Sequence, residues 1–76
     1  RVNPGYPPRA AERGVEGNVV VVLRVERDGT VQHAEVISSE PPGVFERSAL
    51  KALRSWRYAP RPQTARIEAI AIVFEL

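Results

Sequence analysis

The dipeptide Asp28-Gly29 is the feature that most constrains how this chain folds. Both residue types tolerate a positive φ angle, and an Asp-Gly pair between two apolar runs is among the strongest short signals of a β-hairpin. The preceding run places large apolar residues at every second position, namely Val19, Val21, Leu23 and Val25. This period of two predicts a strand. A second strand is expected from Thr30 to Ser38, paired antiparallel with the first.

The second expected strand has an irregular apolar pattern. Val31 is out of phase with Ala34 and Val36, so these side chains cannot all point to one face of a regular strand. We therefore expect a β-bulge or a shift of face near Gln32 and His33.

A helix is expected on each side of this hairpin in the sequence. Pro7 and Pro8 suit the first turn of a short helix, and Gly14 suits its end. The second helix should follow the segment "EPPG", with Gly43 as a suitable N-cap and Pro60 preventing its continuation. Its apolar residues fall on one stripe at helical spacing: Phe45, Ala49, Ala52, Leu53 and Trp56.

The final segment, "ARIEAIAIVFEL", reads as a strand from Arg66 to Leu76, with large apolar residues on one face and small ones on the other. The predicted order is helix, strand, strand, helix, strand. This order indicates an α+β fold with a small three-stranded antiparallel sheet and two helices packed on one face. A chain of 76 residues makes one domain. We expect residues 1–6 to be an extended N-terminal segment and residues 7–76 to form the folded unit.

The inventory of reactive side chains argues against an enzyme. The chain has no cysteine and one histidine, His33, which we expect to face solvent from a strand. Asp28 belongs to the turn, the serines have no base at a useful spacing, and the glycines match neither a dinucleotide fingerprint nor a phosphate loop. No cofactor and no metal are therefore expected. What is left is a binding module.

The charge pattern gives only weak support for nucleic-acid binding. The net charge is +2, and the arginines are spread from Arg1 to Arg66 with acids between them. Phosphate binding favours basic residues clustered on one face. A small α+β nucleic-acid-binding domain stays open as an alternative function.

The last strand is the best candidate for a binding surface. If it lies at an edge of the sheet, its unpaired backbone groups can accept a short extended peptide as an added strand. If it lies in the centre of the sheet, it is simply part of the core. The pattern alone leaves both readings open.

Several motifs, taken in order, resemble the C-terminal domain of the TonB energy-transducer family. They are the Tyr-Pro opening in "NPGYPPRA", the Glu-Gly pair and Asp-Gly hairpin in "GVEGNVVVVLRVERDGTV", and "FER" and "RSWRYAP" in "VFERSALKALRSWRYAP". A closing alternating strand follows them. The resemblance covers essentially the whole chain.

The resemblance implies a periplasmic domain of a protein anchored in the inner membrane of a Gram-negative bacterium. The family couples a proton-driven motor of the ExbB and ExbD type to outer-membrane receptors that import iron chelates or vitamin B12. Its C-terminal domain binds the receptor's short "TonB box" by β-strand addition to the edge formed by the last strand. A TonB-like domain that serves another cell-envelope partner is an alternative, and a homodimer through the last strand stays open.

The resemblance also implies which residues meet the partner. The edge carried over from the family runs through Ile67, Glu68, Ala69, Ile70, Ala71, Ile72, Val73 and Phe74. A polar residue before the Tyr-Pro pair helps to contact receptor and box in the family. The matching position is Asn3, with Arg1 and Gly5 beside it.

Overall fold

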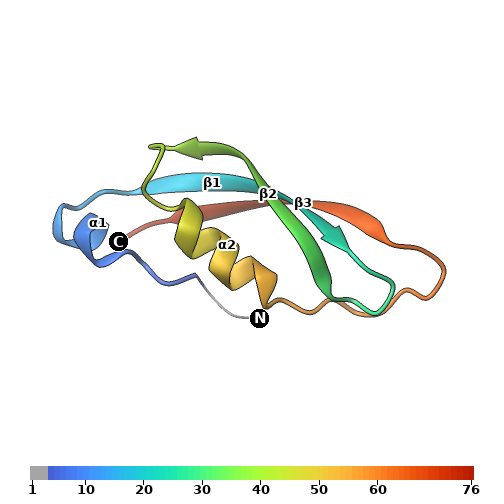
Figure 1. Cartoon of the computed structure of the whole chain (residues 1–76). Coiled ribbons are helices and arrows are strands. Elements are labelled where there is room, and N and C mark those ends of the chain that lie inside the picture. The colour runs from blue at the N-terminus through green and yellow to red at the C-terminus, as the bar shows by residue number, and fades with distance from the viewer. Residues whose placement is uncertain (1–3) are drawn as a thin grey trace.

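The computed structural model describes residues 4–76 of the chain. Its elements are α1 (Pro8–Glu12), β1 (Gly17–Val25), β2 (Val31–Glu40), α2 (Glu46–Arg54) and β3 (Arg66–Phe74). This is the order predicted from the sequence. The three strands form one sheet, α2 lies across one side of it, and α1 lies on that side near the end where the chain terminates (Figure 1). None of the helices within residues 4–76 is long and apolar enough to cross a membrane.

β1 is the central strand of the sheet, whose order is β2-β1-β3. It pairs antiparallel with both neighbours. The register between β1 and β3 is unbroken from Gly17 opposite Phe74 to Val25 opposite Arg66. The last strand of the chain therefore lies at an edge of the sheet, which is the position that strand addition requires.

The hairpin of β1 and β2 is confirmed, and so is its irregularity. The register between β1 and β2 shifts twice, because Gln32 and Ile37 of β2 have no partner in β1. The shift at Gln32 is the bulge predicted from the phase of Val31. The second shift, at Ile37, was not expected from the sequence.

The core lies between β1 and α2, as the two apolar patterns predict. All four alternating apolar residues of β1 are fully buried, and Phe45, Ala49 and Leu53 meet them from the helix side. Trp56, just after α2, is also buried. However, α2 packs mainly on β2 and less on β1. The face of β3 on that side is therefore only partly covered.

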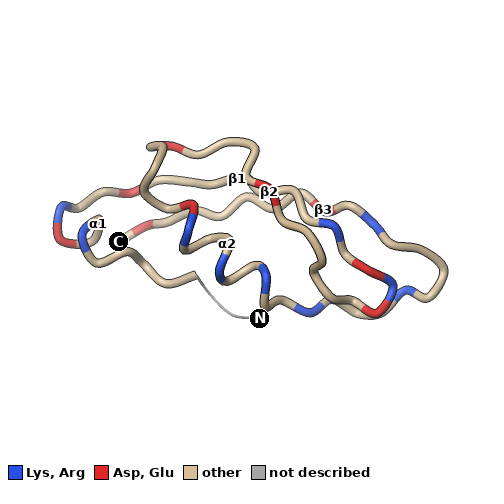
Figure 2. The backbone as a smooth tube through the Cα atoms, viewed as in Figure 1, with Lys and Arg blue, Asp and Glu red and all other residues tan. Residues whose placement is uncertain are grey.

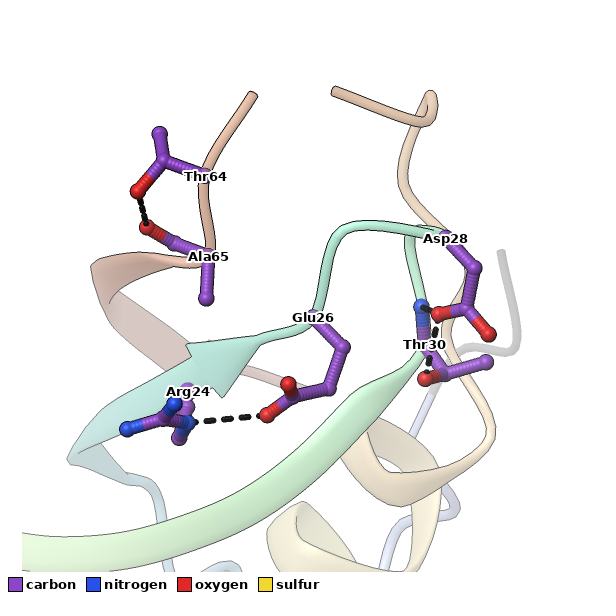
Figure 3. A network of polar contacts seen from close by, with 6 residues as sticks. All are labelled: Arg24, Glu26, Asp28, Thr30, Thr64 and Ala65. Atoms are coloured by element: carbon purple, nitrogen blue, oxygen red, sulfur yellow. Dashed lines mark hydrogen bonds and ion pairs between the residues drawn. The ribbon is translucent and has the colours of Figure 1, made fainter. Parts of the chain in front are cut away.

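The Asp-Gly turn is held by hydrogen bonds within it, which Figure 3 shows, and by one from outside it. Asp28 Oδ1 accepts hydrogen bonds from the backbone N–H of Thr30, at 3.0 Å, and from its hydroxyl, at 2.7 Å. These two bonds, the backbone one first, lower the pKa of Asp28. Gly29 has φ 91° and is buried, and its carbonyl accepts the Tyr58 N–H at 2.8 Å. The turn is thus closed by the chain that leads from α2 towards β3.

The predicted start of α2 and end of β3 were wrong, and β2 runs to Glu40 rather than to the predicted Ser38. The N-cap of α2 is Phe45, not Gly43, and Gly43 instead sits in the preceding turn with φ 81°. Its N–H donates to Glu46 Oε2 at 2.7 Å, and the same oxygen accepts the hydroxyl of Ser39 at 2.7 Å. These bonds, that of Gly43 first, lower the pKa of Glu46. The Glu46 carboxylate thus closes the turn at Gly43, and the helix begins after that turn.

The other boundary is the end of β3, which stops at Phe74 rather than Leu76. Beyond it, the Leu76 N–H donates to Glu16 Oε2 at 2.9 Å, and the Leu76 side chain is exposed. The strand was expected to continue through this final residue. Leu76 instead extends past the last partner that β1 provides.

Candidate partner-binding edge

The outer side of β3 is open to another chain. Within residues 4–76, no backbone hydrogen bond joins β3 to any segment other than β1. In an edge strand, alternate residues point their N–H and C=O groups away from the neighbouring strand. β3 therefore presents a row of donors and acceptors along its length.

The two edges of the sheet differ in how well they can accept a strand. β2, the other edge, carries the two register shifts and exposes charged or ionisable residues such as His33 and Glu35. Bulges and charges are the common means by which proteins protect an edge from pairing. β3 has an unbroken register and mainly apolar side chains from Ile67 to Phe74. The geometry therefore favours β3 over β2 as the docking edge.

The side chains of β3 divide between the two faces of the sheet. On the side of α2, Phe74 is buried while Ile70 and Ile72 are only partly buried. On the opposite face, which no helix covers, Ile67 and Val73 are more than 60% exposed, with two small residues between them. An added strand would extend both faces, and its side chains would cover apolar surface on each.

The predicted site residues fall into three groups. Ile67, Glu68, Ala69, Ile70, Ala71, Ile72, Val73 and Phe74 all lie on β3, along the open edge. Gly5 lies on the N-terminal segment, and its carbonyl accepts a hydrogen bond from the Ser48 hydroxyl of α2. Arg1 and Asn3 lie outside the described residues.

Tyr6 joins the N-terminal segment to the end of the edge. Its ring lies edge-on to Phe45 and to Phe74, with centroid distances of 5.6 and 5.8 Å, and these two rings stack on each other at 4.3 Å. Its hydroxyl donates to the carbonyl of Val15. Partial burial, followed by the charge of Glu16, raises the pKa of Tyr6. These contacts hold the N-terminal segment against the core of the domain.

A hollow of about 650 Å³ is lined by residues of the N-terminal segment and of α2. Its floor is mostly apolar, and Arg47 and Lys51 of α2 stand at its wall beside Gly5 and Tyr6. The hollow therefore lies next to the predicted contact at Gly5. Its position makes the N-terminal segment accessible from the side of α2.

A second hollow, of about 530 Å³, was not anticipated from the sequence. It lies at the opposite end of β3 and is lined by Arg24, Arg27 and Arg66, together with Glu26 and the chain from Thr64 to Ile67. Arg24 and Arg27 are close in the sequence, and the pairing of β1 with β3 brings Arg66 beside them. Elsewhere the basic residues lie on several elements, and α2 carries Arg47, Lys51 and Arg54 with an acid only at its start (Figure 2).

Comparisons with known proteins agree with this architecture. A family model described as Gram-negative bacterial TonB protein C-terminal matches residues 2–76. Protein TonB of Klebsiella aerogenes is 43% identical over 65 residues, which are 84% of this chain and 27% of that protein. Protein TonB of Escherichia coli is 42% identical over 60 residues, 79% of this chain and 25% of that protein. The chain thus spans about a quarter of the length of these relatives.

A solved structure gives the same result in three dimensions. The solution NMR structure of the Pseudomonas aeruginosa TonB CTD superposes with a TM-score of 0.87 and 32% sequence identity. The alignment covers 100% of this chain and 82% of that one. The likeness therefore extends over every element described above.

Proposed function

Because this chain belongs to the family of Gram-negative bacterial TonB C-terminal domains, we propose that it is the receptor-binding domain of a TonB-type energy transducer. In this proposal it binds the TonB box of outer-membrane receptors by β-strand addition. It acts as a non-catalytic adaptor that transmits force from a motor of the ExbB and ExbD type. The imported substrates would be iron chelates or vitamin B12.

The observation that carries the proposal is the state of the β3 edge. β3 has an unbroken register with β1, apolar side chains on both faces, and an outer side that pairs with no described segment. An extended peptide can match this row of backbone groups whatever its exact side chains. We propose that the contact runs from Ile67 to Phe74, and that Arg1, Asn3 and Gly5 form a second contact where the chain enters the domain.

The energetics of such an interface suit a transient partner. Each backbone hydrogen bond contributes about 0.5–1.5 kcal/mol net, and ordering the peptide opposes this gain. The equilibrium affinity should therefore be modest. A strand pulled along its own length shares the load among several hydrogen bonds, so a weak interface can still carry a brief force.

The location follows from the same family. We propose that the domain works in the periplasm and that the full protein is anchored in the inner membrane. Pulling force would enter through the N-terminal segment, which Tyr6 fixes next to Phe74 at the end of β3. The entering chain and the docking edge would then be mechanically connected through an aromatic contact.

An NMR titration with a TonB-box peptide tests the proposal. Amide shifts should concentrate in β3, with smaller shifts near Gly5. Methylating the peptide's amides at alternate positions should abolish binding for one set of positions and spare the other, because only one set faces β3. Shifts confined to the β1–β2 turn, or equal tolerance of both methylated sets, would refute strand addition.

Two other readings make different predictions. A domain that serves another envelope partner would use the same β3 edge but discriminate against TonB-box peptides in a competition assay. Pairing of β3 with a second copy would raise the mass measured by sedimentation as concentration rises. The nucleic-acid alternative loses support because the family assignment points elsewhere.

A further inference from the structure

Arg24 and Arg27, which are neighbours in the sequence, and the distant Arg66 line one hollow at the end of the sheet where β3 begins. Val25 pairs with Arg66 and Arg24 pairs with Ile67, so the end of β1 lies beside the start of β3. Arg27 follows in the turn, and the three arginines line one hollow of about 530 Å³. Figure 3 shows this end, with Arg24 beside Glu26 and Thr64 and Ala65 on the chain entering β3.

The positive charge of this hollow is only partly neutralised. Arg24 Nε lies 2.8 Å from Glu26 Oε2, and this is the one ion pair formed between residues 4–76. Arg27 is exposed and meets no acid at that distance. The Arg66 guanidinium lies 5.1 Å from the centroid of the Tyr58 ring, and its Nη1 has no hydrogen-bond partner among the described residues.

The opposite end of the same edge has the opposite character. Glu75 follows the last residue of β3, and Glu16 reaches the Leu76 N–H at 2.9 Å. Between the ends, Glu68 is the only charged residue among the predicted contacts on β3. A strand added along β3 would therefore lie with one end beside arginines that are only partly neutralised and the other beside carboxylates.

We propose that the arginine hollow, meaning the cavity lined by Arg24, Arg27 and Arg66, binds a carboxylate of the partner segment that flanks the added strand. This inference rests on the proposed function. The acidic end of the partner segment then lies at the Arg66 end of β3, and the hollow sets both its charge preference and its direction.

A tethered carboxylate suits this site better than a free anion does. Arg24 and Arg27 are exposed while Arg66 is partly buried, and single ion pairs in water are weak. A carboxylate on a peptide that already pairs with β3 is held next to the hollow at a high effective concentration. The ion pairs then add selectivity to an affinity that the backbone provides.

The test uses two synthetic peptides that differ only in charge. Both carry the alternating core Thr-Val-Thr-Val-Thr-Val; one has two aspartates at one end, and the other has two asparagines there. A second pair of peptides carries the two aspartates or the two asparagines at the other end of the Thr-Val repeat. For the favoured end, the aspartate peptide should bind the unmodified domain about five-fold more tightly than its asparagine counterpart. Raising the salt concentration should shrink this advantage.

Variants of the domain assign the effect to the hollow. The double variant Arg24→Gln with Arg27→Gln should bind both peptides of the favoured pair equally. Arg54→Gln, which removes an exposed arginine from the end of α2, is the matched control and should retain the preference. Arg66 is left unchanged because its guanidinium packs against Tyr58.

The outcomes separate this inference from the proposed function. If both peptides of each pair shift the amides of β3 with equal affinity, strand addition stands and the arginine hollow has no such role. If no peptide binds, strand addition fails and the inference fails with it. If inorganic phosphate binds as tightly as the aspartate peptide, the hollow is a general anion site and the proposed selectivity is wrong.

Discussion

The ring of Tyr6 packs edge-on against the ring of Phe74, with centroids 5.8 Å apart and an interplanar angle of 77°. These residues are separated by nearly the whole chain, one where it enters the domain and one where its last strand ends. Phe45 stacks on Phe74 and joins α2 to the same cluster. The N-terminal segment, the start of α2 and the end of β3 therefore pack against one another through these rings.

Substitutions in this aromatic cluster should lower stability in a defined order. Phe74→Leu should reduce the free energy of unfolding by about 1–2 kcal/mol, because a well-packed ring is lost from the core. Tyr6→Phe removes only the hydroxyl that donates to Val15, so it should be milder than Tyr6→Ala. Urea unfolding followed by Trp56 fluorescence measures these changes. If Tyr6→Ala leaves the unfolding midpoint unchanged, Tyr6 does not anchor the N-terminal segment.

The close approach of Gly29 to Tyr58 predicts an unusually costly substitution. A Cβ atom on Gly29 would lie 1.9 Å from the Tyr58 carbonyl oxygen, whereas one on Gly43 would meet nothing within 4 Å. Both glycines have positive φ, so Gly29→Ala and Gly43→Ala share the backbone cost of about 1 kcal/mol. Gly29→Ala should therefore lower the midpoint of thermal unfolding clearly more than Gly43→Ala does. Equal losses of stability in the two variants would mean that the turn can move away from Tyr58 at little cost in free energy.

The pKa of Glu46 predicts how stability depends on pH. Its folded-state pKa is lowered, chiefly by the Gly43 N–H and then by the Ser39 hydroxyl. The stabilisation is therefore present above the unfolded pKa of glutamate, about 4.3, and is lost as the pH falls through the lower folded value. Glu46→Gln should flatten this part of the acid unfolding curve. The exposed Glu12→Gln, on α1, is the control and should leave the curve unchanged.

The uncovered face of the sheet predicts a change in solubility without a change in stability. Ile37, Ile67 and Val73 are about 60% exposed. Replacing Ile37 by lysine should alter the free energy of unfolding by less than about 0.5 kcal/mol, because few contacts are lost. It should also raise the concentration at which light scattering begins. Val21→Lys, on the buried face of the same sheet, should prevent folding, and an equal effect of the two changes would contradict the assigned faces.

Most of the fold could be predicted because its signals are local. The Asp28-Gly29 turn, the alternation in β1 and the helical stripe from Phe45 to Trp56 each depend on residues close in sequence. Even the bulge at Gln32 was visible in the phase of Val31. The start of α2 was placed too early because Gly43 suits an N-cap, whereas the residues after it form a turn closed by the Glu46 carboxylate.

The candidate site could be predicted only in part. A strand pattern says nothing about which neighbours a strand has, so the edge position of β3 came from the family resemblance until the structure placed it there. The arginine hollow depends on the register that sets Arg24 opposite Ile67. This long-range pairing depends on the packing of the whole sheet. The residues around Arg24 and Arg27 in the sequence do not predict it.

Because α2 is off-centre on the sheet, the hydrophobic core of this domain is incompletely covered on the side of β3. Ile70 and Ile72 face the helix layer but are only partly buried, because α2 rests mainly on β2. A fourth strand would complete their burial, so any ligand at that edge also becomes a structural member of the domain. Occupancy and folding are then thermodynamically linked. The domain should be most resistant to unfolding when it is engaged, which is when it would have to bear load.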